Sequence, residues 1–364
     1  MLHKITEKIY SGERLSLEEA LLLYEEAPLS ELAVLANYRR EQLNGKKVFF
    51  NRNFHLEPTN ICVNDCVFCS YRRSAGEVGS WNYSLEEMLA ECRRQAETGI
   101  TEVHIVGGVH PDRDVHYYAN LLKAVKEVLP AGVFIKAFTA IEIDYMVRKA
   151  NISLHDGLLL LQRSGLTAIP GGGAEILDDE IRRQICPKKG SSEVWLKVHE
   201  TAHQLGIRTN ATMLFGHIET PLQRIRHLIK LRDLQDLTGG FDAFIPLKYK
   251  SRNNALGNTG EAPAMEVLRT VAMSRLVLDN VPHIKAYWPM LGKELMQMSL
   301  LFGADDIDGT INDSTKIYSM AGAEEHPVLT DDELRRLVHD AGFIPVERDT
   351  LYNEIFFVSL QQST

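Results

Sequence analysis

Two hydrophobic periods alternate along most of the 364-residue chain. Short apolar runs typical of buried strands are separated by longer stretches with the helical period, and this alternation repeats about eight times. Repeated strand and helix units predict a parallel sheet covered by helices. The expected strands span residues 48–56, 102–108, 133–139, 165–173, 207–216, 241–247, 282–288 and 304–310.

Three of the expected helices begin with a capping box, in which a serine or threonine is followed three residues later by a glutamate. The boxes are Ser16 to Glu19, Ser84 to Glu87 and Thr330 to Glu333, and Gly99 fits the end of the second helix. A helical segment therefore precedes the first strand, and another follows the last. A strand-rich tail at 344–360 completes the chain.

The order of these elements favours an α/β fold, a (β/α)8 TIM-type barrel with N-terminal helical and C-terminal α/β extensions. No Gly-x-Gly-x-x-Gly turn follows the first strand, which argues against an open dinucleotide-binding sheet. We expect a helical extension at 1–47, the barrel at 48–320, and an extension packed on it at 321–364. The loops after the barrel strands form one mouth, where active sites lie.

Composition excludes several classes of function. The formal charge of -9 argues against a nucleic-acid surface. The N-terminus lacks the apolar core of a signal peptide, and no run approaches the roughly 18 apolar residues of a membrane helix. We therefore expect a cytoplasmic protein that binds neither nucleic acid nor a membrane.

Three of the five cysteines, Cys62, Cys66 and Cys69, lie within eight positions after the first expected strand. Such clustering in a long chain indicates metal binding or catalysis in a reducing compartment. Cys92 falls inside an expected helix and Cys186 follows another strand, so neither is an obvious fourth ligand.

Because the loop has three cysteines and not four, each possible metal site would differ in its fourth ligand. Structural zinc usually takes four ligands, so a zinc site would need a residue such as His55. Three unrelated buried thiols are a further alternative. A 4Fe-4S cluster normally takes four thiolates, and three would leave one iron open to another ligand.

The spacing Cys-x3-Cys-x2-Cys, with Phe68 before the third cysteine, resembles the radical S-adenosylmethionine superfamily. The resemblance implies a 4Fe-4S cluster on the three cysteines and S-adenosylmethionine as a co-substrate bound to the open iron. It also implies that Gly107 and Gly108 in "HIVGGVHP" receive the methionine amino group. Val109 stands where this superfamily often has an acidic residue.

Other segments narrow the resemblance. "IPGGGAEIL", "IRRQICPKK", "TNATMLFGHIE" and "QDLTGGFDAFIPL" resemble enzymes of the futalosine route to menaquinone and their deazaflavin-forming relatives. "AYWPMLGKELMQMSLLFGADDIDGTI", "MAGAEEHPVLT" and "AGFIPVERDTLY" are most similar to the aminofutalosine synthase family. The similarity implies that the 5'-deoxyadenosyl radical adds to 3-[(1-carboxyvinyl)oxy]benzoate. Rearrangement and decarboxylation would then give 6-amino-6-deoxyfutalosine, with reduced flavodoxin or ferredoxin as the electron donor.

Three alternatives stay open at this point. Cyclic dehypoxanthinylfutalosine synthase is a paralogue in which the radical abstracts hydrogen, and a deazaflavin-forming enzyme would take tyrosine and a ribityl-uracil. A non-catalytic iron-sulfur or zinc protein belongs to a different class. Free 5'-deoxyadenosine without an adduct would favour hydrogen abstraction over addition.

The candidate site residues follow from the resemblance and from the polar residues at the ends of the expected strands. Asn210 and Thr212 share one parity of a strand, so both point into the barrel, where polar groups need partners. Glu175 either binds the cofactor ribose or complements a helix dipole. The candidates for cofactor binding are Phe68, Tyr71, Gly107, Gly108, Glu175, Asn210 and Thr212.

Two substrate carboxylates call for cationic partners, and arginine binds carboxylates bidentately. Arg182 either serves this purpose or pairs with Asp178 at i,i+4. The candidates for substrate positioning are His110, His217, Arg182, Arg72 and Tyr287. Further candidates at the mouth are Arg73, Lys248, Trp288, Asp306 and Asp308.

Overall fold

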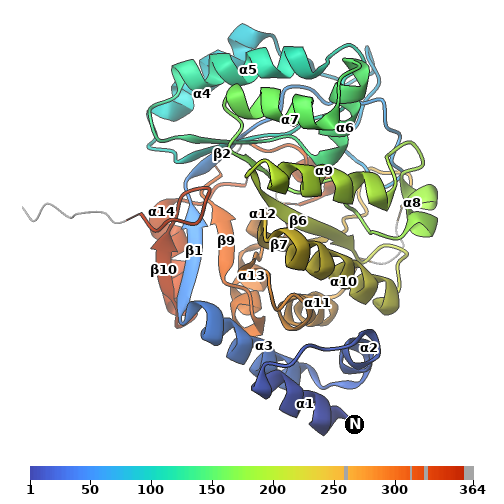
Figure 1. The fold of residues 1–364 in the computed structure, drawn as a ribbon. Helices are drawn as coiled ribbons and strands as arrows, with labels where there is room; N and C mark the ends of the chain where they lie inside the picture. The colour runs from blue at the N-terminus through green and yellow to red at the C-terminus, as the bar shows by residue number, and fades with distance from the viewer. Residues whose placement is uncertain (258–260, 312–313, 324–326, 356–364) are drawn as a thin grey trace, which may run out of the picture.

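In the computed structural model, which describes residues 1–257, 261–311, 314–323 and 327–355, seven parallel strands form one curled sheet (Figure 1). Their order in the sheet is the order in the chain, as expected for repeated strand and helix units. The strands are β2 (Asn53–Leu56), β3 (Glu102–Ile105), β4 (Phe134–Ala137), β5 (Ala168–Ile169), β6 (Arg208–Phe215), β7 (Phe241–Lys248) and β8 (His283–Ile284).

Helices connect these strands and cover the outside of the sheet, as Figure 1 shows. Their apolar faces pack on the strands and leave the inner face free to line a site. These helices are α4 (Leu85–Ala96), α5 (Val115–Val128), α6 (Ala140–Lys149), α7 (Leu154–Arg163), α8 (Asp179–Ile185), α9 (Ser192–Gln204), α10 (Pro221–Thr238) and α11 (Ala264–Val277).

A second sheet of three strands, in the order β10-β1-β9, joins the first. It consists of β1 (Lys47–Asn51), β9 (Asp306–Gly309) and β10 (Ile344–Glu347). The expected first strand is divided at Arg52 into β1 and β2, and a bridge between Lys285 and Asp306 links β8 to β9. The α/β barrel prediction is confirmed, but the ring comprises two joined sheets because its first and last units pair away from the other strands.

The ends of the chain lie outside this ring. Helix α1 (Leu2–Ser11), α2 (Leu17–Glu26) and α3 (Leu29–Asn44) precede β1, and α2 and α3 pack on α10 and α11. After β8 come α12 (Trp288–Leu291), α13 (Lys293–Ser299), η1 (Leu300–Phe302), η2 (Ser319–Ala321) and α14 (Asp331–Asp340). None of the helices in these ranges is long and apolar enough to cross a membrane.

Local signals in the sequence are confirmed at the helix ends. All three capping boxes form, with the serine or threonine oxygen accepting the amide of the third helical residue. Gly99 has a φ of +73° in the turn after α4. Of the expected strand-rich tail, β10 is present, and 356–360 lies outside the described residues. The proposed division at 47/48 and 320/321 stays a prediction.

Candidate active site

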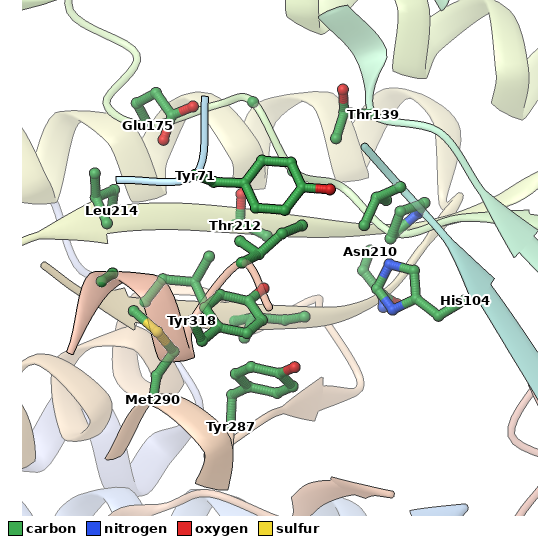
Figure 2. Close-up of a pocket in the computed structure, with 18 of the residues that line it drawn as sticks. Tyr71, His104, Thr139, Glu175, Asn210, Thr212, Leu214, Tyr287, Met290 and Tyr318 are labelled. Atoms are coloured by element: carbon green, nitrogen blue, oxygen red, sulfur yellow. The ribbon is translucent and has the colours of Figure 1, made fainter. Parts of the chain in front are cut away.

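A cavity of about 260 Å³ lies inside the barrel, and its lining comes from the strands and from the loops that follow them. Figure 2 shows Tyr71, Tyr318 and Tyr287 projecting into it, with His104 and Asn210 at one side. The lining is mainly apolar, with charged side chains among it from both the strands and the loops that follow them. Such a cavity suits an organic molecule that has both aromatic and anionic parts.

The deep end of the cavity is built from two buried ion pairs. Lys136 Nζ lies 2.8 Å from Glu102 Oε2, and Lys285 Nζ lies 2.5 Å from Asp308 Oδ1. Burial raises the pKa of Glu102, but Lys136 and Arg348 outweigh it and hold that pKa well below its usual range. These pairs therefore hold fixed charges at the deep end of the cavity.

Two histidines from neighbouring strands lie against each other, with tilted rings, beside these pairs. The rings of His55 and His104 lie 4.4 Å apart, and both ring nitrogens of His55 lack a hydrogen-bond partner within the part of the chain that the structure describes. Burial lowers the pKa of His55 to about 4 and that of His104 well below its usual value. Both rings are therefore neutral near pH 7. The zinc alternative offered His55 as a fourth ligand, and in the structure its ring lies tilted against that of His104.

The cysteine loop runs from β2 along the cavity wall, where Cys69 is part of the lining. All five cysteines carry free thiols. Burial raises the pKa of Cys66 to about 12 and also raises that of Cys62, and the ammonium of Lys189 acts against burial at both sulfurs. Backbone amides of Val109 and Asn64 also hydrogen-bond the Cys62 sulfur. No three His, Cys, Asp or Glu side chains within the described ranges converge on a single-ion position.

The three cysteine thiols, together with the lysine and the backbone amides near them, fit a cluster bound through thiolates. Thiolates are the ligands of iron-sulfur clusters, and amide donors and a lysine stabilise the negative charge that such a cluster carries. The three free thiols lie on one short loop at the cavity wall, so a group held there would face the cavity.

The two glycines after β3 lie against the backbone of the cysteine loop. A Cβ at Gly108 would lie 2.4 Å from the carbonyl oxygen of Ile61, and one at Gly107 would lie 2.8 Å from that of Thr59. Only glycine fits such a close approach. The Gly107 amide donates to Glu142 Oε1 at 3.2 Å, and burial raises the pKa of Glu142 to about 7. Gly107 lines the cavity, whereas Gly108 is not part of the lining.

All five of the other cofactor candidates line the cavity. Its lining includes Phe68, Tyr71, Glu175, Asn210 and Thr212. Glu175 accepts a hydrogen bond from Lys189 Nζ at 2.5 Å, and Thr212 Oγ1 donates to the Gly171 carbonyl at 2.9 Å. Tyr71 donates to the Thr59 carbonyl at 3.1 Å, which orients its ring. The parity prediction for Asn210 and Thr212 is confirmed by their place on the inner face.

Tyr287 also lines the cavity, whereas the other candidates for substrate positioning lie outside it. Arg182 donates to the carbonyls of Ala174 and Gly190, and its nearest carboxylate is Asp179, not Asp178. Its buried guanidinium thus stabilises the glycine-rich loop at 171–174. The geometry gives no support to direct substrate contact by Arg182.

The two candidate histidines and Arg72 are likewise occupied by local contacts. His110 Nδ1 accepts the Asp112 amide at 3.1 Å. His217 Nδ1 accepts the Ile218 amide at 2.8 Å, and its Nε2 lies 3.1 Å from the Leu214 carbonyl. Arg72 donates to Ser74. None of the three is part of the cavity lining, so their role in positioning the substrate stays a prediction that the geometry does not support.

The further candidates divide in the same way. Asp308 lines the cavity, whereas Asp306 is buried outside it and binds Arg348 and Tyr352. Trp288 Nε1 donates to the Gly309 carbonyl in the core. The other two, Arg73 and Lys248, are also absent from the lining.

Sequence reasoning missed several residues of the lining. These are His104, Lys136, Lys189, Lys250, Lys285, Met290 and Tyr318. The alternation of side chains along a strand could have identified those on strands. Glu102 and His104, like Asn210 and Thr212, are two residues apart on one strand and so point to the same face. Lysine in an apolar strand, as in "VFIKAFT", is the same kind of signal. Tyr318 comes from a loop with no comparable pattern.

Two family models match the chain. The model described as "Radical SAM superfamily" matches residues 56–231, and that described as "CofH/MqnC C-terminal region" matches 238–359. The first match contains the cysteine loop and four strands of the seven-stranded sheet, β3 to β6. The second contains the last strands and α14.

Curated relatives match over nearly the whole chain. An aminodeoxyfutalosine synthase of Thermus thermophilus is 45% identical over 96% of this chain and 95% of the relative. A cyclic dehypoxanthine futalosine synthase of Streptomyces coelicolor is 38% identical over 97% and 89%. A 5-amino-6-(D-ribitylamino)uracil--L-tyrosine 4-hydroxyphenyl transferase of Methanoculleus marisnigri is 38% identical over 96% and 97%.

Solved structures agree on the fold. Methylornithine synthase (PylB) superposes with a TM-score of 0.75 at 19% identity, covering 94% of this chain and 97% of that one. At that identity the likeness supports the fold alone. Taken with the family models and the curated relatives, it shows that the chain belongs to the radical SAM enzymes, in the family of aminodeoxyfutalosine synthase and its relatives.

Proposed function

We propose that this enzyme is an aminodeoxyfutalosine synthase, which joins the adenosyl part of S-adenosylmethionine to 3-[(1-carboxyvinyl)oxy]benzoate with loss of one carboxyl group. The observation that carries the proposal is the 45% identity to an enzyme of that name over 96% of the chain. It exceeds the 38% identity to each of the two relatives with other names. The cavity adds a second, independent line of support.

Cys62, Cys66 and Cys69 would hold the cluster, because their thiols are free, Lys189 acts on the sulfurs of Cys62 and Cys66, and two backbone amides hydrogen-bond that of Cys62. When bound, the 4Fe-4S cluster supplies the electron that cleaves S-adenosylmethionine. Glu175, held by Lys189, and the inward Asn210 and Thr212 offer hydrogen-bonding groups for the adenosyl part. Tyr71 and Phe68 offer aromatic faces on the same side of the cavity as Cys69.

The substrate has an aromatic ring and two carboxylates, so it needs apolar walls and at least one cation. Tyr287, Tyr318 and Met290 form an apolar wall, and the rings of Tyr287 and Tyr318 meet edge to face at 5.0 Å. The Tyr287 hydroxyl has no hydrogen-bond partner among the described residues. A bound carboxylate would satisfy it.

Lys250 is the cation best placed for a substrate carboxylate. The other three cavity lysines, Lys136, Lys189 and Lys285, lie 2.5 to 2.8 Å from protein carboxylates. Lys250 Nζ lies 3.7 Å from Glu261 Oε2, beyond hydrogen-bond distance. Burial lowers the pKa of Lys250, so pairing with an incoming carboxylate would recover part of the desolvation cost.

Choice of substrate tests the proposal. The anaerobically reconstituted, reduced enzyme is incubated with S-adenosylmethionine and, separately, with the carboxyvinyloxybenzoate, with dehypoxanthine futalosine, and with tyrosine plus ribitylaminouracil. Mass spectrometry should find an adenosyl-bearing product with the first substrate alone. Turnover confined to either other substrate would assign the chain to the corresponding relative.

A further inference from the structure

Residues 314–323 form a segment that closes one side of the cavity, and we call this segment the strap. It contains η2 and contributes Ile317, Tyr318 and Ala321 to the lining. Figure 2 shows Tyr318 projecting between Tyr71 and Tyr287. Within these described residues the strap contains one short turn of helix, η2, and no strand. Its position therefore depends on individual hydrogen bonds and side-chain contacts.

One carboxylate makes most of the contacts at the start of the strap. Oε1 of Glu57 accepts hydrogen bonds from Thr315 Oγ1 at 3.0 Å, from the Lys316 amide at 2.9 Å and from the Ile317 amide at 3.2 Å. Glu57 is 5% exposed, so these bonds are shielded from water. Its other oxygen, Oε2, is buried and has no partner among the described residues. A carboxylate bound by several donors fixes those donors strongly.

Glu57 follows β2 directly and precedes the cysteine loop, so it ties the strap to the wall of the cavity that bears the cysteines. The neighbouring amide of His55 donates to Ser314 Oγ at 2.9 Å, which is a weaker contact between neutral groups. Farther along, Lys316 Nζ lies 3.0 Å from the Tyr83 hydroxyl, at the exposed edge. Glu57 thus provides the buried carboxyl anchor for the strap; burial raises its pKa to about 7, and its hydrogen bonds from Ile317, Lys316 and Thr315 favour the charged form.

We propose that Glu57 is a positioning residue that holds the strap closed over the cavity, so that the reactive adenosyl fragment meets the substrate and not a hydrogen donor of the buffer or reductant. Glu57 is not part of the cavity lining and acts through Ile317 and Tyr318. A primary carbon radical abstracts hydrogen from accessible C–H and S–H bonds but not from the stronger O–H bond of water, so the outcome depends on orientation and on exclusion of such donors. This inference rests on the proposed function, because it assumes that the productive outcome is an adduct.

The test measures how S-adenosylmethionine cleavage divides between adduct and free 5'-deoxyadenosine. For E57A we expect the ratio of free 5'-deoxyadenosine to adduct to rise about tenfold or more, because the strap loses the acceptor of three hydrogen bonds. E57Q retains an acceptor oxygen and should fall between E57A and the parent enzyme. Iron content and total cleavage should stay close to those of the parent.

Glu333 supplies the matched control. It accepts the Thr330 amide at 3.0 Å at the start of α14, well outside the cavity lining, so E333A removes a similar bond without releasing the strap. An unchanged product ratio in E57A, or an equal rise in E333A, would overturn the inference.

A second measurement separates this inference from the proposed function. Hydrogen exchange at the Lys316 and Ile317 amides should be faster in E57A than in the parent, whichever substrate the enzyme uses. Unchanged exchange would refute the anchoring role. If the parent enzyme forms no adduct with the benzoate but E57A still accelerates exchange, the proposed function fails and the anchor stands. Should E57A not load iron, E57Q is tested in its place.

Discussion

The ion pair between Glu102 and Lys136 offers a quantitative test of the charged end of the cavity. Both side chains are at most 3% exposed, and Thr350 Oγ1 donates to the same Glu102 oxygen at 2.6 Å. The substitution K136M keeps the length of the side chain and removes its charge. Glu102 then loses its closest cationic partner in a site with almost no water.

The expected loss of unfolding free energy in K136M depends on whether Glu102 stays charged or binds a proton. An unpaired buried charge typically costs about 3–5 kcal/mol. The carboxyl can escape that cost by binding a proton, which at pH 7 costs about 3.7 kcal/mol for a glutamate of ordinary pKa. We therefore expect K136M to lower the free energy of unfolding by about 3–4 kcal/mol at pH 7.

The sign of the pH dependence follows as well. In K136M the folded-state pKa of Glu102 rises above its unfolded value, so the folded state binds the extra proton and the variant becomes less stable as pH rises. The loss should shrink by about 1.4 kcal/mol for each unit that the pH is lowered toward 5. Urea unfolding of the anaerobic apoprotein at two pH values measures both quantities.

A double variant isolates the charge from the packing. E102Q combined with K136M leaves no uncompensated charge, so it should recover most of the loss, to within about 1 kcal/mol of the parent. A K136M loss below about 1 kcal/mol at pH 7, or a loss that does not depend on pH, would refute the reasoning.

Three further predictions concern the remaining groups of the site. K250Q should lower kcat/KM for the benzoate substrate by about ten- to a hundredfold, through loss of a charged hydrogen bond, whereas K248Q, outside the lining, should have little effect in the same steady-state assay. Because burial raises the pKa of Glu142 to about 7, the folded state holds its proton and stability falls as pH rises from about 4.5 to 7; E142Q should remove up to about 3 kcal/mol of that decline in urea titrations, and an unchanged slope would contradict it. C66A should lose the charge-transfer absorption and about four irons per chain, while C92A, in α4, should keep both; retention of the iron by C66A would rule out the proposed ligands.

The strand pattern predicted the α/β barrel because periodicity reports directly which faces are buried. It placed all seven strands of the main sheet and the capping boxes of three helices. It missed the break at Arg52, since β1 and β2 follow each other with a single residue between them and differ in the strands with which they pair. Pairing is a tertiary property that the pattern of one segment does not contain.

The candidate site was predicted where a motif or a parity set the direction of side chains. The cysteine loop, Asn210 and Thr212 are of that kind. Arginine candidates failed to reach the cavity because a loop arginine also satisfies nearby carbonyls, as Arg182 does with Ala174 and Gly190. Glu57 and the Ile317 amide come together across 260 residues, and no local signal marks their contact.

Transfer of an isotopic label from S-adenosylmethionine tests the central claim most directly. The reduced holoenzyme is given adenosyl-labelled S-adenosylmethionine and 3-[(1-carboxyvinyl)oxy]benzoate, and the products are separated by mass spectrometry. We predict that the label appears in 6-amino-6-deoxyfutalosine in equal amount to the methionine released. Label found wholly in free 5'-deoxyadenosine, with the benzoate unchanged, would contradict the account.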